Sequence, residues 1–222
     1  PLLRVERAHM QWDGDILKEI TSLSVLTCLQ QSVMNFGILM VQGLVNSFGT
    51  AVMAAFAAAV KIDSFAYMPA QEFGNSFSIF ISQNYGAGNR ERVREGVHAS
   101  VRISMLFCIM ASAVIFLAAR YLMLIFISPS ETEIIQIGVQ YLRIEGAFYC
   151  GIGMLFLLYG YYRGTGRPEM SLILTVISLG TRVVLAYALA PVFGVAAIWC
   201  AIPTGWLLAD LAGVWYQRED FI

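Results

Sequence analysis

The chain has 222 residues, of which 58% are hydrophobic and 13% are charged, and its formal net charge at pH 7 is −1. Soluble domains carry about 45–50% apolar and about 25% charged residues, so this composition argues against a water-soluble globular enzyme and indicates a protein that crosses the lipid bilayer several times. The near-neutral charge gives no indication of a nucleic-acid partner.

Residue types that hold metals or perform covalent catalysis are dispersed along the chain. The four cysteines lie in separate apolar stretches without a C-x-x-C pair, and the two histidines, His9 and His98, lie far apart. We therefore predict neither a disulfide framework nor a zinc site, and no catalytic residues of an integral membrane enzyme. The chain begins at Pro1 with a polar segment that has no signal-peptide pattern, so we expect a fragment of a longer protein.

Six apolar segments are long enough to cross a bilayer, since a spanning helix needs about 20 residues. We predict an all-α fold, a polytopic membrane protein with a six-transmembrane-helix bundle. The predicted spans are 20–46, 50–84, 98–126, 132–162, 169–190 and 193–216. Residues 1–19 are expected to form a cytoplasmic linker with an amphipathic lead-in, 20–217 the transmembrane bundle, and 218–222 the start of a cytoplasmic tail.

Turn sequences with recognisable signals separate the spans. The segment SPSETE holds Ser130 and Glu133 at capping-box spacing, which predicts a helix start. The segment RGTGRPE is a glycine turn that places Pro168 at the first position of the next helix. The segment APVFG, at 190–194, is read as a tight turn.

The second predicted span, 50–84, is too long for a straight crossing. At a rise of about 1.5 Å per residue it would measure about 52 Å, against a hydrocarbon core of about 30 Å. It must therefore tilt, bend or protrude. Pro69 lies inside it and removes one backbone hydrogen bond, so we predict a kinked transmembrane helix.

The positions of the basic residues predict the orientation of the spans, because cytoplasmic loops carry an excess of Lys and Arg. Six crossings place ten of the 14 Lys and Arg residues on one side, whereas the alternate loops hold only Arg120. The ten are Arg4, Arg7, Lys18, Arg90, Arg92, Arg94, Arg102, Arg163, Arg167 and Arg218. We expect that side to be cytoplasmic, so that both ends of this chain face the cytoplasm.

Ionisable side chains inside the predicted spans are the main functional signal. Each costs about 2.5–3.5 kcal/mol on insertion scales, and those that persist usually face a bundle interior or a water-filled cavity. Lys61 and Glu72 share one face of the second span, whereas Asp63 lies on another, which predicts a polar stripe facing a cavity. The alternative is that Lys61 snorkels and Asp63 pairs with a neighbouring span. The full set is Lys61, Asp63, Glu72, Arg143, Glu145, Arg182 and Asp210.

Tyr141, Glu145 and Tyr149 are spaced i, i+4, i+8 and share a face of the fourth predicted span. A carboxyl group flanked by two phenols in a low-dielectric cavity would take up and release a proton or accept a cationic ligand. The alternative is an ion pair between Glu145 and Arg143 or Arg182 that fixes helix packing. Nearby glycines in this span would let the helix bend.

Uncharged polar side chains extend the predicted cavity lining. Gln31, Asn35 and Gln42 lie on one face of the first span, and Gln71 and Asn75 continue along the second. They either line a wet path or form hydrogen bonds between helices, which are modest in strength.

Three stretches carry a resemblance to a known family. They are VNSFGT followed by AAFAAAVKIDSFAYMPAQEFGNSFSIFISQNYGAGNRERV, then FISPSETEIIQIGVQYLRIEGAFY, then YYRGTGRPEMSLILTVISLGTRVVLAY. In this order they resemble the C-terminal half of the multidrug and toxic compound extrusion (MATE) transporters. The resemblance covers nearly the whole chain, from about Asp15 to Tyr216, and QNYGAGN and RGTGRP are its most specific pieces.

The resemblance implies twelve helices in two six-helix lobes of a cell-membrane antiporter that exchanges organic cations or drugs for Na⁺ or H⁺ by alternating access. This chain would be the second lobe. Its partners would be the missing N-terminal six-helix lobe of the same chain, lipophilic or cationic small molecules and the lipid bilayer. No cofactor is implied besides Na⁺ or H⁺ as the coupling ion.

The resemblance also bears on individual residues. One branch of the family binds Na⁺ in this lobe through acids on the seventh and tenth helices, and Glu145 matches the tenth-helix position. Residues 20–50 hold no acid, so that Na⁺ site would be incomplete, and other branches place the key acid on the first helix. Lys61, Asp63 and Glu72 would line the central cleft between the lobes.

One alternative remains within transport, a related flippase of lipid-linked oligosaccharides. Such a protein is expected to have a strongly basic central cavity. The charges within the spans of this chain are mixed, with three basic and four acidic side chains, which favours the drug antiporter.

Overall fold

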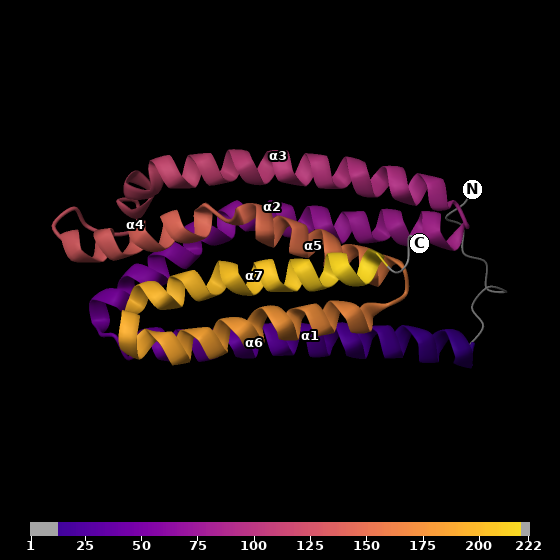
Figure 1. The fold of residues 1–222 in the computed structure, drawn as a ribbon, viewed down its shortest axis with the longest axis horizontal. Helices are drawn as coiled ribbons and strands as arrows, with labels where there is room; N and C mark the ends of the chain where they lie inside the picture. Colours follow the sequence, from indigo (N-terminus) through magenta and orange to yellow (C-terminus); the bar gives the residue numbers. More distant parts are fainter. Residues whose placement is uncertain (1–12, 219–222) are drawn as a thin grey trace.

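The computed structural model describes residues 13–218, and that part of the chain is helical throughout, without strands (Figure 1). The helices are α1 (Gly14–Asn46), α2 (Thr50–Gly86), α3 (Arg90–Met123), α4 (Thr132–Gly146), α5 (Tyr149–Gly164), α6 (Pro168–Phe193) and α7 (Val195–Arg218). The predicted all-α class is confirmed. The expected linker residues 1–12 and tail residues 219–222 lie outside the described residues, whereas 14–19 are already part of α1, with Asp13 as its N-cap.

Five helices, α1, α2, α3, α6 and α7, are long and apolar enough to cross a bilayer, and α4 with α5 forms a sixth crossing bent by 52°. The predicted number of spans is thus confirmed, but the fourth is broken rather than straight. The last hydrogen bonds of α4 run from Ala147 N–H to the Arg143 carbonyl and from Phe148 N–H to the Glu145 carbonyl. Tyr149 then begins α5 in a new direction.

The third and fifth predicted spans differ from the observed helices. The third predicted span, 98–126, corresponds to α3, which begins already at Arg90, because the Asn89 side chain accepts a hydrogen bond from Arg92 N–H and caps an earlier turn, and which ends at Met123. The fifth, 169–190, corresponds to α6, which continues through Pro191 to Phe193 instead of turning at 190–194, since a membrane helix tolerates the loss of one donor, and Gly194 with φ of 68° ends it.

The predicted capping box does not form. The Ser130 hydroxyl lies 3.0 Å from the Ser128 hydroxyl, and α4 starts after Glu131 without a side-chain cap. The glycine turn before α6 is as predicted, with Gly166 at φ of 77° and Pro168 in the first helical position.

The first turn of α1, the last turn of α7 and the α2–α3 and α5–α6 connections lie at one end of the bundle in Figure 1. Arg90, Arg92, Arg94, Arg163 and Arg167 therefore gather at that end, as the sequence predicts. The cytoplasmic location of this end stays a prediction.

Apolar side chains cover the outside of the bundle while several polar groups lie inside it. Large exposed apolar residues occur on every long helix, among them Leu106, Leu117 and Tyr121 on α3. The buried polar residues are Gln30, Asp63, Ser104, Glu145, Ser171, Thr175 and Ser178. The burial of Asp63 and Glu145 fits the expectation that ionisable residues in spans face the bundle interior, whereas Lys61, Glu72 and Arg143 are exposed.

The helix α2 packs against α5 and also contacts α3 and α4, while α1 lies beside α6 and α6 beside α7. Pro69 lies inside α2 without interrupting it, and Figure 1 shows that the first part of α2 runs obliquely to the second. The bend that the proline predicts is therefore present, and it places α2 against both segments of the broken span.

Candidate functional site

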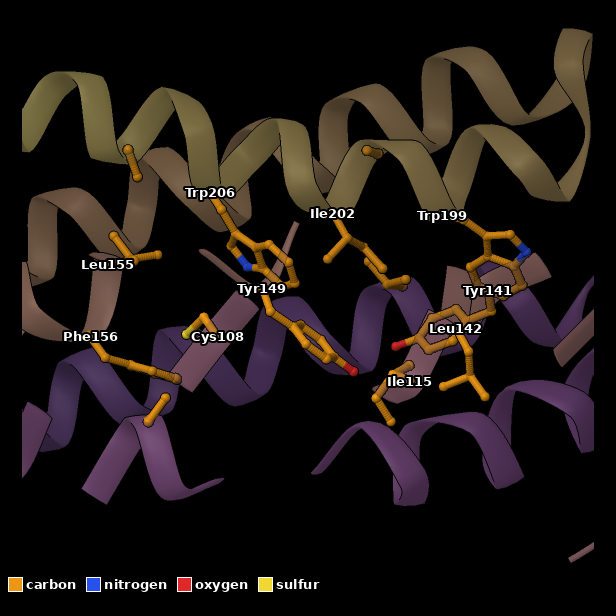
Figure 2. Close-up of a cluster of buried hydrophobic side chains, with 14 of the residues drawn as sticks. Cys108, Ile115, Tyr141, Leu142, Tyr149, Leu155, Phe156, Trp199, Ile202 and Trp206 are labelled. Carbon is orange, nitrogen blue, oxygen red and sulfur yellow. The ribbon is translucent and has the colours of Figure 1, made fainter. Parts of the chain in front are cut away.

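A partly open cavity of about 160 Å³ lies between the helices of the bundle. Its lining comes from α1, α2, α4, α5, α6 and α7, so every crossing except α3 contributes. A buried aromatic cluster closes one part of it: the rings of Phe56 and Trp199 stack at 5.3 Å, and Tyr141 meets Trp199 edge to face at 4.9 Å. Figure 2 shows Trp199, Ile202 and Trp206 projecting from α7 toward Tyr141 and Tyr149.

Two carboxyl groups are the central feature of the cavity. Asp63 from α2 and Glu145 from α4 are 5% and 2% exposed, and they lie close enough for each to act electrostatically on the other. The Tyr149 hydroxyl donates a hydrogen bond to Oδ1 of Asp63, and Tyr141 contacts Glu145. In Figure 2 the hydroxyl groups of Tyr141 and Tyr149 point toward the same region. Two adjacent acids in a dry interior do not both ionise readily, so this pair suits the uptake of a cation.

Arg182 of α6 supplies the opposing charge. It lines the same cavity and acts electrostatically on both Asp63 and Glu145. Its Nε and Oε1 of Glu145 are nevertheless buried without a hydrogen-bond partner among the described residues. The predicted Arg143–Glu145 pair is not formed, because Arg143 is exposed on the opposite face of α4 and lies over the Phe116 ring.

The sequence predicted some of these neighbours correctly and not others. Asp63, Gln71, Tyr141 and Glu145 line the central cavity, and Tyr149 reaches it through Asp63. Tyr141 and Glu145 belong to α4 but Tyr149 to α5, so the three do not share one straight helix as predicted. They meet because the bend brings the start of α5 against Asp63.

The remaining predicted residues lie elsewhere. Gln31 lines a second cavity of about 170 Å³ that shares Gln71 with the first. Asn35, Lys61 and Glu72 are exposed and line neither of these two cavities. Lys61 and Glu72 lie on the side of α2 opposite to Asp63. Because Asp63 is turned toward α4 and α5, the side chains of Lys61 and Glu72 point away from these helices. Asp63 pairs with Tyr149 of a neighbouring span, as one of the two interpretations of the second span expects, and a cavity-facing role of Lys61 and Glu72 stays a prediction.

Sequence reasoning missed a polar chain beside the second cavity. Arg163 Nη2 donates to Asn75 Oδ1 at 2.9 Å, and Asn75 Nδ2 donates to Glu72 Oε2 at 3.2 Å. It also missed Thr175 and Ser178 of α6, which line the central cavity together with the predicted Arg182. The i, i+3, i+7 spacing of these three residues is the signal that would have identified this face of α6.

We expect Tyr149→Phe to destabilise the folded full-length protein, since the change leaves Oδ1 of Asp63 buried without its hydrogen bond. Such a loss typically costs about 1–3 kcal/mol. A lower Tm in detergent would show it. Tyr121→Phe is the control, because Tyr121 is exposed on α3. Equal Tm values for the two variants would contradict the importance of this bond.

The comparisons with known proteins agree on one family. The family model MatE matches residues 24–188. The "Probable multidrug resistance protein YpnP" of Bacillus subtilis (strain 168) is 32% identical over 212 residues, which cover 94% of this chain and 46% of that protein. The "Probable multidrug resistance protein NorM" of Thermotoga maritima is 27% identical over 211 residues, with 90% and 45% covered.

Solved structures share the fold. A MATE transporter crystallised in complex with MaL6 has a TM-score of 0.91 at 21% identity, over 99% of this chain and 50% of that one. A MOP superfamily transporter from Pyrococcus furiosus Vc1 has a TM-score of 0.90 at 22% identity, over 97% and 49%. The chain therefore spans about half the length of the relatives that it matches.

Proposed function

Since the chain belongs to the MatE family of membrane transporters, we propose that it forms the C-terminal lobe of an antiporter that exports organic cations or drugs in exchange for H⁺ or Na⁺ by alternating access. The observation that carries this proposal is the buried pair of Asp63 and Glu145 inside a six-span bundle. The relatives named as multidrug resistance proteins support the substrate class.

The size of the central cavity separates the ion site from the drug site. At about 160 Å³ it is smaller than the roughly 300–1,000 Å³ of sites for drug-sized ligands, but it has room for several water molecules or an ion. The drug therefore binds outside it, between this lobe and its partner lobe. The exposed Lys61, Glu72, Gln31 and Asn35 are proposed to line that cleft.

The acid pair is proposed to act through the bend in the fourth span. Glu145 lies in the last turn of α4, and Tyr149, which begins α5, is hydrogen-bonded to Asp63 on α2. A cation or proton at the pair changes the charge opposite Arg182 and the strength of the Tyr149 bond. Since these contacts cross the 52° bend, the bound ion favours one orientation of α4 relative to α5.

Na⁺ binding would use the carboxylates of Asp63 and Glu145 with the neighbouring tyrosine oxygens. We propose H⁺ as the coupling ion, because a proton needs only one of the two carboxyl groups, whereas Na⁺ would need both of them together with further oxygens. We also propose that the protein lies in the plasma membrane with both ends of this chain in the cytoplasm.

The test is transport by the full-length protein in proteoliposomes. We expect an imposed pH gradient to drive export of the cationic dye ethidium, and a Na⁺ gradient without a pH difference to drive less. Dye movement that ignores both gradients would overturn the antiporter proposal. Flipping of lipid-linked oligosaccharides in the same liposomes would instead favour the flippase, which neither the structure nor the comparisons support.

A further inference from the structure

A crevice of about 530 Å³ opens between α3 and α4, away from the central cavity. Arg120 of α3 and Arg143 of α4 both line it. Figure 1 shows the start of α4 extending beyond the end of α3, so a residue well inside α4 lies level with the last turn of α3. The Arg143 guanidinium lies 5.4 Å from the centre of the Phe116 ring, one turn from Arg120, which places the two cations at similar depth.

Neither arginine is neutralised within the described part of the chain. The Arg143 contact with Phe116 is a cation–π contact, and neither guanidinium has a hydrogen bond or ion pair among residues 13–218. The nearest acids along α4, Glu131 and Glu133, are exposed at its start and do not line the crevice. Two like charges sharing one crevice repel each other unless an anion joins them, so the site is electrostatically incomplete.

The other walls of the crevice fit a phosphate group attached to something apolar. Gln136 and Gln140 bring amide donors to the same crevice, and Ile135, Val139 and Ile144 form its apolar part. Arginine with amide donors is the combination that holds phosphate oxygens in proteins. Isoleucine and valine walls do not suit a free, fully hydrated phosphate.

An exposed apolar track leads away from the arginines along α3. Leu117, Ile109 and Leu106 are 77%, 57% and 61% exposed, and Phe116 lies beside them. From Arg120 to Leu106 the helix rises about 21 Å, which exceeds the depth of one leaflet of about 15 Å. The most apolar 18-residue stretch of α3 has a higher mean hydropathy than the corresponding stretches of the other four long helices, and only 17% of it is buried, as expected for a surface in contact with acyl chains.

We propose that the crevice binds the headgroup of an anionic phospholipid from the leaflet at the α3–α4 end, with the phosphate between Arg120 and Arg143 and an acyl chain along the exposed face of α3. Arg143 and Glu145 share the last turn of α4, so the bound lipid holds α4 against α3 next to the acid pair. This site is independent of the proposed antiport and is tested without a transport measurement.

The test uses the purified full-length protein in detergent. Dioleoyl phosphatidylglycerol is titrated against dioleoyl phosphatidylcholine and inorganic phosphate, and binding is followed by retained lipid adducts in native mass spectrometry and by Tm. We expect phosphatidylglycerol to be retained and to raise Tm, with little effect from the other two. The double variant R120Q/R143Q is expected to weaken phosphatidylglycerol binding at least about tenfold, and R120K/R143K less.

The matched control is R92Q/R102Q, which removes two exposed arginines from the other end of α3. We expect R92Q/R102Q to retain phosphatidylglycerol as strongly as the wild type. Equal losses in both double variants would mean non-specific charge attraction and would overturn the site. A Tm increase by inorganic phosphate alone would identify a free-anion site and overturn the lipid assignment. If R120Q/R143Q is not recovered folded, the single variants R120Q and R143Q are titrated in the same way. Each is expected to bind phosphatidylglycerol more weakly than the wild type, and wild-type binding by both would overturn the site.

Discussion

Replacing Glu145 by Gln is expected to abolish ion-coupled dye efflux by the full-length protein, reducing it to the rate of protein-free liposomes. The amide matches the carboxyl group in shape, so the packing against Tyr141 is retained, but it can neither release a proton nor carry the negative charge that opposes Arg182. If ion binding at this pair drives the conformational change, a side chain fixed in the neutral state cannot cycle. The measurement is pH-gradient-driven ethidium export in proteoliposomes.

The acid pair offers an internal check on this prediction. Asp63→Asn is expected to be equally inactive, and the double variant no worse than either single variant, because neighbouring groups that act as a unit give non-additive losses. Glu133→Gln is the control, since Glu133 lies on the same helix but is exposed near its start. Wild-type efflux by Glu145→Gln would remove this residue from the coupling mechanism.

The sequence was sufficient for the spans because lipid imposes a simple requirement on them. About 20 apolar residues must be continuous, and turn residues must lie between them, so six crossings could be counted directly. The basic residues then placed alternate loops on the same side of the bundle, and the glycine turn before Pro168 correctly predicted the start of α6. These signals are local, and each can be read within one segment of the chain.

The candidate site was only partly predictable because its contacts are not local. The sequence identified Glu145 and Asp63 as costly charges, yet Tyr149 and Asp63 are 86 residues apart and their hydrogen bond depends on how α2 packs on α5. The break after Gly146 was suggested by glycines, but its 52° angle comes from tertiary packing. Lys61 was predicted to belong to the site, although its side chain is exposed. Helical periodicity shows which residues share a face of a helix, but it does not show which face packs against other helices.

The same packing of α2 on α5 explains the second large effect that we expect. The two helices approach so closely that their backbones touch at glycine positions. A Cβ at Gly160 would lie 2.5 Å from the Gly74 carbonyl oxygen, and a Cβ at Gly74 would lie 2.8 Å from the Phe156 carbonyl oxygen. Small residues at such crossings let membrane helices pack by van der Waals contact. The hydrogen bond between Tyr149 and Asp63 also joins these two helices.

We expect Gly160→Val to lose most of the folded full-length protein, measured as the monodisperse fraction after membrane extraction and as Tm. Overpacking a core typically costs about 1–3 kcal/mol, and here the obstacle is backbone rather than a flexible side chain, so the helices must separate. Gly160→Ala is expected to show the same defect to a smaller extent, because its single methyl group meets the same carbonyl oxygen.

Gly180→Ala on α6 is the matched control, since a Cβ there meets nothing within 4 Å in this lobe. It is expected to keep Tm or raise it, because alanine favours a helix over glycine by about 1 kcal/mol. A Gly160→Val protein with wild-type Tm would show that α2 and α5 are farther apart than the structure places them. The hydrogen bond from Tyr149 to Asp63 would then lose its structural basis, because it depends on the same approach of the two helices.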